Sequence, residues 1–186
     1  MPSPAWIGII VSALALMWVI ATFNSLVSLR NRVRNAWSQI DVQLKRRHDL
    51  IPNLVETVRG YMQHESSVFQ AVTQARTEAI AAGTNIQDRT AAESRLSSAL
   101  GRLFVVAENY PQLRAVENFQ ILQEELTSTE NRIAYARQFY NDEVMKYNTV
   151  QSTFPRNLFS GLFGISPADL FAAAEDDRLE TRINLG

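Results

Sequence analysis

The first 29 residues carry no charged side chain, and arginines follow at once. Within this stretch, residues 5–23 are apolar apart from Ser12 and Thr22. A helix over these residues would be about 28 Å long, close to the bilayer's apolar thickness of about 30 Å. A cleavable signal peptide would start with a basic region, and a buried core helix would show one apolar stripe. We therefore predict a transmembrane helix over 5–23.

Flanking residues predict how this anchor sits. Tryptophans near its two ends suit the membrane interfaces, and we take as anchor residues Trp6, Ile9, Leu14, Trp18 and Phe23. The preceding tetrapeptide has no lysine or arginine, whereas the following segment has Arg30, Arg32 and Arg34. Because positive charge stays on the cytoplasmic side, we expect the N-terminus outside and the C-terminal domain in the cytoplasm. The three arginines would also contact anionic lipid headgroups.

Composition limits the possible chemistry of the remaining domain. The net charge of −1 argues against nucleic acid as a partner. The chain has no cysteine, which removes disulfides, thiol catalysis and thiolate metal sites. Its two histidines, His48 and His64, lie in no zinc or di-iron motif. We therefore expect no catalytic residues, no cofactor and no metal.

Apolar residues beyond the anchor recur at steps of three and four, which predicts helices. The first of these continues from the anchor over 24–62. Pro52 interrupts it, so we expect a kink or a break near 49–52, with Asp49 capping a restarted helix. The apolar stripe then resumes and ends near Ala82.

Two further helices follow. A capping-box pattern, Thr90 to Glu93, predicts a helix from Thr90 to Glu108. Pro111 suits a first helical position, and a long helix is expected from Gln112 to Ser152. Short connections make neighbouring helices antiparallel. The predicted fold is all-α, an elongated antiparallel bundle continuing from the anchor, with this organisation: tail 1–4, anchor 5–23, bundle 24–152, C-terminal segment 153–186.

Polar residues lie near the apolar stripe of the third predicted helix: Glu130, Arg137, Asn141 and Asn148. Such residues usually find partners inside a bundle and fix its register, and the alternative is an interface role. Lys45, Arg46 and Arg47 form the densest basic cluster. It is interpreted as a solvated or internally paired patch, with a subunit contact as the alternative. Lipid contact is disfavoured because an upright helix places Lys45 about 33 Å from the membrane.

The C-terminal segment is the strongest candidate for an interaction surface. Prolines and glycines end the long helix there, and an amphipathic turn and a further helix from Ser166 are expected. The segment either caps the bundle or docks on a neighbouring subunit, with membrane insertion as a minor option. The candidate interface residues are Leu158, Phe159, Leu162, Phe163, Leu170 and Phe171. The acidic residues 175–180 would suit the basic cluster of another copy.

Several phrases resemble the LemA family of membrane-anchored bacterial proteins. They include Gln43–Arg47, Asp49–Val55, Gly60–Glu65, Tyr110–Leu113, Leu122–Leu126, Glu130–Ile133, Phe154–Pro155 and Gly161–Gly164. Ile165 departs from the pattern, since an aromatic residue is expected there. The resemblance implies a single span in the bacterial inner membrane, a cytoplasmic helical domain and no recognised catalytic activity. It also implies a loose link to membrane remodelling and organelle formation.

These observations favour a non-enzymatic membrane scaffold. We expect the chain to form a homo-oligomer that organises or remodels the bilayer, because a membrane anchor raises the effective concentration of neighbouring copies. The alternative is an adaptor or regulator of another membrane protein, such as a protease or a sensor. The expected partners are thus the lipid bilayer, further copies of the chain and possible membrane proteins, but not nucleic acid.

Overall fold

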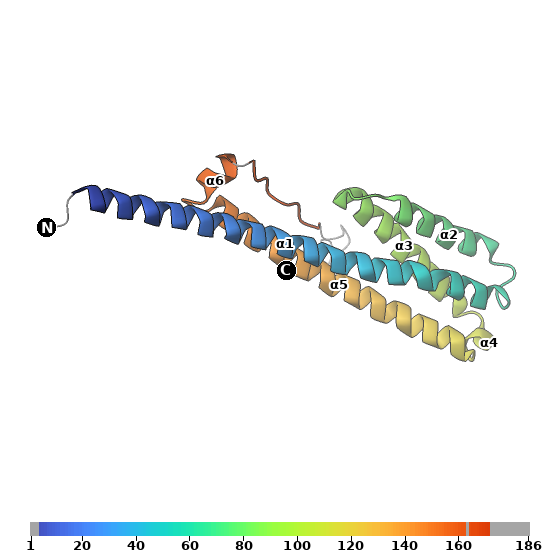
Figure 1. Ribbon diagram of the computed structural model, residues 1–186. Helices are drawn as coiled ribbons and strands as arrows, with labels where there is room; N and C mark the ends of the chain where they lie inside the picture. The colour runs from blue at the N-terminus through green and yellow to red at the C-terminus, as the bar shows by residue number, and fades with distance from the viewer. Residues whose placement is uncertain (1–3, 163, 172–186) are drawn as a thin grey trace, which may run out of the picture. The chain divides into compact units, whose positions relative to one another are not determined.

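The computed structural model describes residues 4–162 and 164–171, and every regular element in them is a helix (Figure 1). The elements are α1 (Pro4–Arg59), α2 (Ser66–Ala81), α3 (Ile86–Ala107), α4 (Pro111–Arg114), α5 (Glu117–Ser152) and α6 (Asn157–Leu162). No strand occurs in the described ranges. The all-α prediction, with an apolar N-terminal helix continuing into a helical bundle, is confirmed.

Helix α1 runs for 56 residues without a break. An 18-residue window in its N-terminal part has a mean hydropathy of 2.2, and 6% of that window is buried. By length and composition, this part of the helix can cross a membrane. At about 1.5 Å per residue, the same helix extends well past the apolar thickness of a bilayer. The predicted anchor and the first helix of the bundle are therefore one element.

Pro52 lies inside α1, and the helix passes through it. A proline cannot donate to the carbonyl four residues earlier, which here belongs to His48. Arg76 of α2 supplies the missing donor, with its Nε 2.8 Å from the His48 carbonyl oxygen. Of the two predicted alternatives, a kink or a break near 49–52, the break is therefore wrong, and so is a restarted helix capped by Asp49.

Helix α1 ends instead at Arg59, in a turn before α2. The backbone N–H groups of Tyr61 and Met62 both donate to the Val58 carbonyl at 3.0 Å, which closes the helix. The Tyr110 hydroxyl donates to Glu65 at 3.2 Å across the same turn. Met62 is fully buried in this turn, so the reversal of the chain packs around an apolar side chain.

The start of α3 also differs from the prediction. Asn85 is the N-cap, and its side chain accepts from the N–H groups of Gln87 and Asp88. Gly83 has a φ of 67°, which favours glycine in the preceding turn. Thr90 instead donates to the Ile86 carbonyl at 2.7 Å, one turn inside the helix. The Thr90 capping box is therefore wrong.

The predicted third helix is divided into two. Pro111 occupies the first turn of the short helix α4, as expected, and Leu113 of α4 is fully buried. The chain then re-enters a helix at Glu117, and α5 continues for 36 residues to Ser152. The N–H groups of Val116 and Phe119 donate to carbonyls three residues earlier, which bridges α4 and α5.

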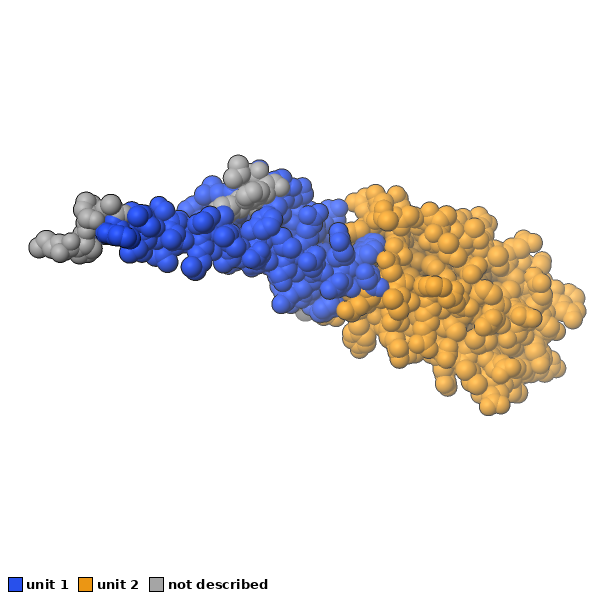
Figure 2. All heavy atoms as spheres, viewed as in Figure 1, with its two compact units in different colours: residues 1–38, 139–169 blue, residues 39–138, 170–186 orange. Residues whose placement is uncertain are grey.

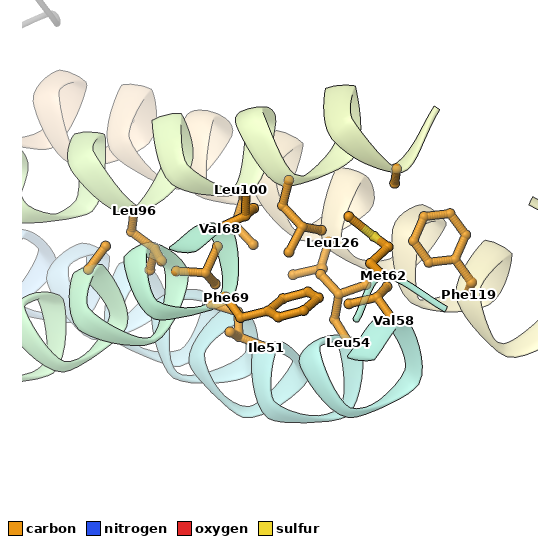
Figure 3. Packing of buried hydrophobic residues seen from close by; sticks show 14 of the residues in the cluster. Ile51, Leu54, Val58, Met62, Val68, Phe69, Leu96, Leu100, Phe119 and Leu126 are labelled. Carbon is orange, nitrogen blue, oxygen red and sulfur yellow. The ribbon is translucent and has the colours of Figure 1, made fainter. Parts of the chain in front are cut away.

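The described chain divides into two compact units (Figure 2). Unit 2 comprises residues 39–138 and 170–186, and unit 1 comprises residues 1–38 and 139–169. The apolar core of unit 2 draws on α1, α2, α3 and α5, as shown by Ile51, Phe69, Leu96 and Leu126 in Figure 3. Burial of such side chains is the main stabilising contribution to a bundle of this kind.

In unit 1, α1 and α5 run in opposite directions. Their aromatic rings meet edge to face at Trp37 and Tyr140, with ring centroids 5.5 Å apart and planes at 65°. Thr22 and Leu26 of α1 are 4% and 1% exposed, so they lie under other residues of this part of the chain. Val144 and Tyr147 provide the corresponding buried face of α5.

Candidate functional site

A buried ionic network lies inside unit 2 at Arg47, a side chain that is fully buried. The Arg47 guanidinium donates through Nη2 to Glu93 of α3 and through Nη1 to Glu130 of α5, the latter at 2.5 Å. Nη1 also donates to the Ser97 hydroxyl at 3.0 Å, and Ser97 donates to Glu130 at 3.1 Å. One residue of α1 thereby connects three helices.

His48 and Glu93 complete this network. His48 Nε2 lies 3.1 Å from Glu93 Oε1, and Glu93 is 1% exposed. Burial by itself would raise the pKa of Glu93, but the hydrogen bond with His48 and the charges of Arg47 and His48 outweigh burial and lower it. The carboxylate is thus held in its ionised form, with Arg47 paired to Oε2 and His48 close to Oε1.

Arg137 of α5 lies in the same unit. Its guanidinium carbon is 5.5 Å from the centroid of the Phe171 ring, a cation–π distance. Burial lowers the pKa of Arg137, and the nearby charge of Arg47 lowers it further, while Glu130 opposes both. The Phe171 side chain is 5% exposed, so its ring is part of the interior of unit 2.

A second arrangement lies in unit 1, where residues 165–169 run beside α5. We call these residues the strap. Four α5 side chains donate to strap carbonyls: Tyr140 to Asp169 and Tyr147 to Ser166, both at 3.0 Å, Asn148 to Ala168 at 2.9 Å, and Gln151 to Ile165. The Ala168 N–H returns a bond to Asn148 at 2.9 Å. The strap carbonyls, which have no helical partners, thus accept their hydrogen bonds from side chains of α5.

No helix forms at Ser166–Asp169, so the predicted C-terminal helix is wrong. The strap carbonyls at Ser166, Ala168 and Asp169 are already engaged by α5. An extended strap satisfies its backbone with side chains from a neighbouring helix. The strap therefore holds the chain against α5 just after α6.

Surface hollows lie near the ionic network, and their linings differ in polarity. One of about 260 Å³ is lined by Asp41, Lys45, His48, Asp49, Arg76 and Arg89, where both signs of charge alternate. Arg89 pairs with Asp41 at 2.7 Å and Lys45 with Asp49 at 3.0 Å. Within 4–162 and 164–171, no three His, Asp or Glu side chains gather as metal ligands would.

The helical architecture agrees with the family that the sequence matches. A family model described as "LemA family" matches residues 36–184. The chain belongs to the LemA family. This match covers most of the chain and includes the residues of both the ionic network and the strap.

Named relatives of this LemA-family chain include magnetosome proteins. Magnetosome protein MamQ 2 of Paramagnetospirillum magneticum is 26% identical over 87% of this chain and 70% of its own length. Magnetosome protein MamQ of Magnetospirillum gryphiswaldense is 23% identical, covering 90% and 72%. Protein LemA of Metamycoplasma hominis is 24% identical, covering 84% and 72%.

The predicted anchor residues of this LemA-family chain lie on the outside of α1. The exposed fractions are 62% for Trp6, 59% for Ile9, 58% for Leu14, 43% for Trp18 and 42% for Phe23. Arg30, Arg32 and Arg34 are also exposed. Large apolar side chains that point outward along most of a span of this length fit a membrane protein.

The basic cluster is split by the fold. Lys45 and Arg46 are exposed, and each has a partner: Lys45 pairs with Asp49, and Arg46 lies 3.7 Å from Glu125. Arg47 points inward to Glu93, so its assignment to a subunit interface is wrong. The spacing explains this difference, because Arg47 lies three residues after Leu44 on the buried side of α1.

The C-terminal candidates are split as well. Leu158 is 64% exposed and Leu170 is 47% exposed, so both remain accessible. Phe171 is buried against Arg137, so its assignment to an intermolecular surface is wrong. The side chains of Phe159, Leu162 and Phe163, and the acidic residues 175–180, lie outside what the structure describes.

The sequence interpretation missed Glu93, His48 and Ser97 as members of the network. Glu93 was assigned to a helix cap, although it lies three residues before Leu96 on the apolar face of α3. A carboxylate on an apolar stripe indicates a buried partner, and that signal was available. Glu130 and Asn148, expected to find partners within the bundle, pair with Arg47 and Ala168.

Proposed function

We propose that this chain is a membrane-anchored, non-enzymatic scaffold that self-assembles to organise or remodel the membrane. The observation that carries the proposal is how its buried charge is used. Buried Arg47 of α1 pairs with buried Glu93 of α3 and with half-buried Glu130 of α5, so these pairs fix helix register. A reactive group needs an approach for substrate, and Arg47 and Glu93 are each 1% exposed at the side chain.

The membrane location in this proposal rests on α1. The outward apolar surface of residues 6–23 suits lipid, and Arg30, Arg32 and Arg34 follow it directly. The positive charge favours an N-terminus outside and a cytoplasmic bundle, at the inner membrane of a bacterium. Three relatives named as magnetosome proteins agree with a role at an organised membrane.

The assembly surface in this proposal is the exposed side of α1 in unit 2. Val42 is 63% exposed and lies one turn from both Lys45 and Arg46, which are exposed too. An apolar side chain with a charged rim is typical of a protein interface. Anchoring confines copies to two dimensions, so a weak contact suffices for association.

The first test is the mass of full-length protein in a mild detergent, measured by mass photometry. A defined oligomer is expected. Val42→Asp should shift it to smaller species, because a charge at the centre of the contact opposes association. Val105→Asp on α3, where the valine is 64% exposed, is the matched control and should leave the mass unchanged.

A monomer at all concentrations would contradict self-assembly. In that case a specific complex with another membrane protein, captured by crosslinking in cells, would identify the chain as an adaptor or regulator of a protease or sensor. An equal effect of Val42→Asp and Val105→Asp would retain assembly but reject the α1 surface as its contact.

A further inference from the structure

The register of α1 and α5 places the end of α5 near the end of the membrane span. Trp37 and Tyr140 are level with each other, because their rings are in contact. Going back from Trp37 to Phe23 covers 14 residues, about 21 Å. Going on from Tyr140 to Ser152 covers 12 residues, about 18 Å, in the same direction since the helices are antiparallel. The two endpoints therefore lie at nearly the same level.

Burial on α1 agrees with this register. Thr22 and Leu26 are 4% and 1% exposed, although their neighbours Phe23 and Val27 are 42% and 41% exposed. Apart from α1 itself, unit 1 consists of residues 139–169. That part of the chain therefore covers one side of α1 at the level where the predicted span ends.

The segment between α5 and the strap is held at that level from both ends. Ser152 ends α5, and the strap begins again beside it, where Gln151 donates to the Ile165 carbonyl. The described residues between Ser152 and Ile165 thus begin and end beside the same turn of α5. Helix α6 lies within this excursion and belongs to the same compact unit as the N-terminal part of α1 (Figure 2).

Two large apolar side chains of this excursion are exposed. Phe154 is 75% exposed and Leu158 is 64% exposed. Residues 153–168 contain no Asp or Glu and one positive charge, Arg156. A cluster of outward aromatic and aliphatic side chains without acidic residues is typical of a segment at a lipid interface.

Exposed arginines of α1 lie just beyond the level of the excursion, on the side away from the span. Arg30 and Arg34 are exposed on α1 and lie about 10 and 16 Å beyond Phe23 along the helix. Anionic headgroups attract such residues within about a Debye length of the surface. Apolar groups at the level of Phe23, with arginines just beyond them, match the order of layers in a leaflet.

We propose that residues 153–164, including α6, insert Phe154 and Leu158 into the headgroup–acyl boundary of the leaflet that α1 enters. This inference rests on the membrane span in the proposed function. The segment is a second membrane contact, joined to α5 by the strap. A chain held at two points resists tilting and rotation in the bilayer, whereas a single helix does not.

The test uses the natural lack of cysteine in this chain. A nitroxide is attached to full-length Leu158→Cys in nanodiscs of phosphatidylcholine with a minor fraction of phosphatidylglycerol, at one chain per disc. Collision with oxygen, which concentrates in lipid, is compared with collision with a water-soluble nickel chelate. Val105→Cys, equally exposed in unit 2, is the aqueous control, and Leu14→Cys at the centre of the span is the lipid control.

The label at 158 should collide more with oxygen than with the nickel chelate, as at 14 and unlike at 105. Phe154→Cys should give the same result, which guards against a local effect of Leu158→Cys on α6. A nickel-accessible label at both 154 and 158, with the label at 14 in lipid, overturns the inference and leaves the anchor intact. A label at 14 that is open to nickel overturns the span itself.

A second copy of the chain is the competing occupant of this surface, and the disc format separates it from lipid. If labels at 154 and 158 are shielded only when discs carry several copies, the segment docks on a neighbour and the lipid assignment fails. If shielding is the same at one and several copies per disc, lipid is the occupant.

Discussion

Arg47 of α1 is buried and pairs with carboxylates of α3 and α5. Its substitution should therefore destabilise the bundle strongly. Removing one partner of a buried pair leaves the other charge without compensation, at a cost of about 3–5 kcal/mol. We therefore expect Arg47→Met to lower the free energy of unfolding of the full-length protein by that amount, because Glu93 stays buried with only His48 beside it. Chemical denaturation followed by circular dichroism measures this change.

Lys45 provides the matched control for Arg47. It lies two residues away in the same basic cluster, but its side chain is 77% exposed and pairs with an exposed Asp49. Exposed pairs contribute about 0–1 kcal/mol, so Lys45→Met should have a small effect. Equal losses for the two variants would show that the buried network contributes nothing beyond surface charge.

Glu93 gives unit 2 a dependence on acid. Its pKa is lowered from the ordinary value of 4.5 in the folded state, so ionised Glu93 stabilises the fold fully above 4.5. That contribution is lost as the pH falls through the lower folded pKa. The stability gap between the native protein and Glu93→Gln should therefore be widest near neutral pH and narrow on acidification. Denaturation midpoints over this range measure the gap, and a gap independent of pH would contradict the assignment.

At the scale of the element, α1 stays continuous because a neighbouring helix compensates for its proline. Pro52 removes the donor to the His48 carbonyl, and Arg76 of α2 replaces it at 2.8 Å. A buried carbonyl that loses its donor costs about 1–3 kcal/mol. The stability of α1 at Pro52 thus depends on one hydrogen bond between α1 and α2.

A double-mutant cycle tests this compensation. Arg76→Met should lower the free energy of unfolding by about 1–3 kcal/mol in the native background, because the His48 carbonyl is left without a donor. In Pro52→Ala the residue 52 N–H donates to that carbonyl, so the same substitution should cost less. Denaturation of the four proteins gives the coupling energy, and additive effects would refute the compensation.

The apolar stripes predicted which segments are helical, but they did not predict where helices stop. Ile51, Leu54 and Val58 carry the stripe of α1 straight through Pro52, and the burial of all three confirms it. The donor from Arg76, 28 residues along the chain, has no local signal. The strap was missed for the same reason, since the side chains that hold it lie on another element. Burial periodicity is local, whereas the partners of backbone groups are set by tertiary contacts.

At the scale of the whole molecule, the long helices α1 and α5 each contribute residues to both compact units. Helix α1 contributes the apolar anchor to unit 1 and Arg47 to unit 2, and α5 contributes the strap contacts to unit 1 and Glu130 to unit 2. The anchor was predictable because an uncharged stretch of this length has few other uses. The ionic network was predictable only in part: Glu93 lies on an apolar stripe, whereas Arg47 lies in a cluster whose other two members are exposed.

The proposed orientation in the membrane rests on where the arginines lie. Arg30, Arg32 and Arg34 come directly after the span, and residues 1–4 carry no lysine or arginine. In a chain without cysteine, Val105→Cys should resist a membrane-impermeant maleimide in spheroplasts and react after permeabilisation, whereas Ser3→Cys should react at once. Replacing the three arginines with glutamine while placing lysines at positions 2 and 4 should reverse both results. Labelling of Val105→Cys in intact spheroplasts would place the bundle outside, and the lipid contact of residues 153–164 would then belong to the outer leaflet.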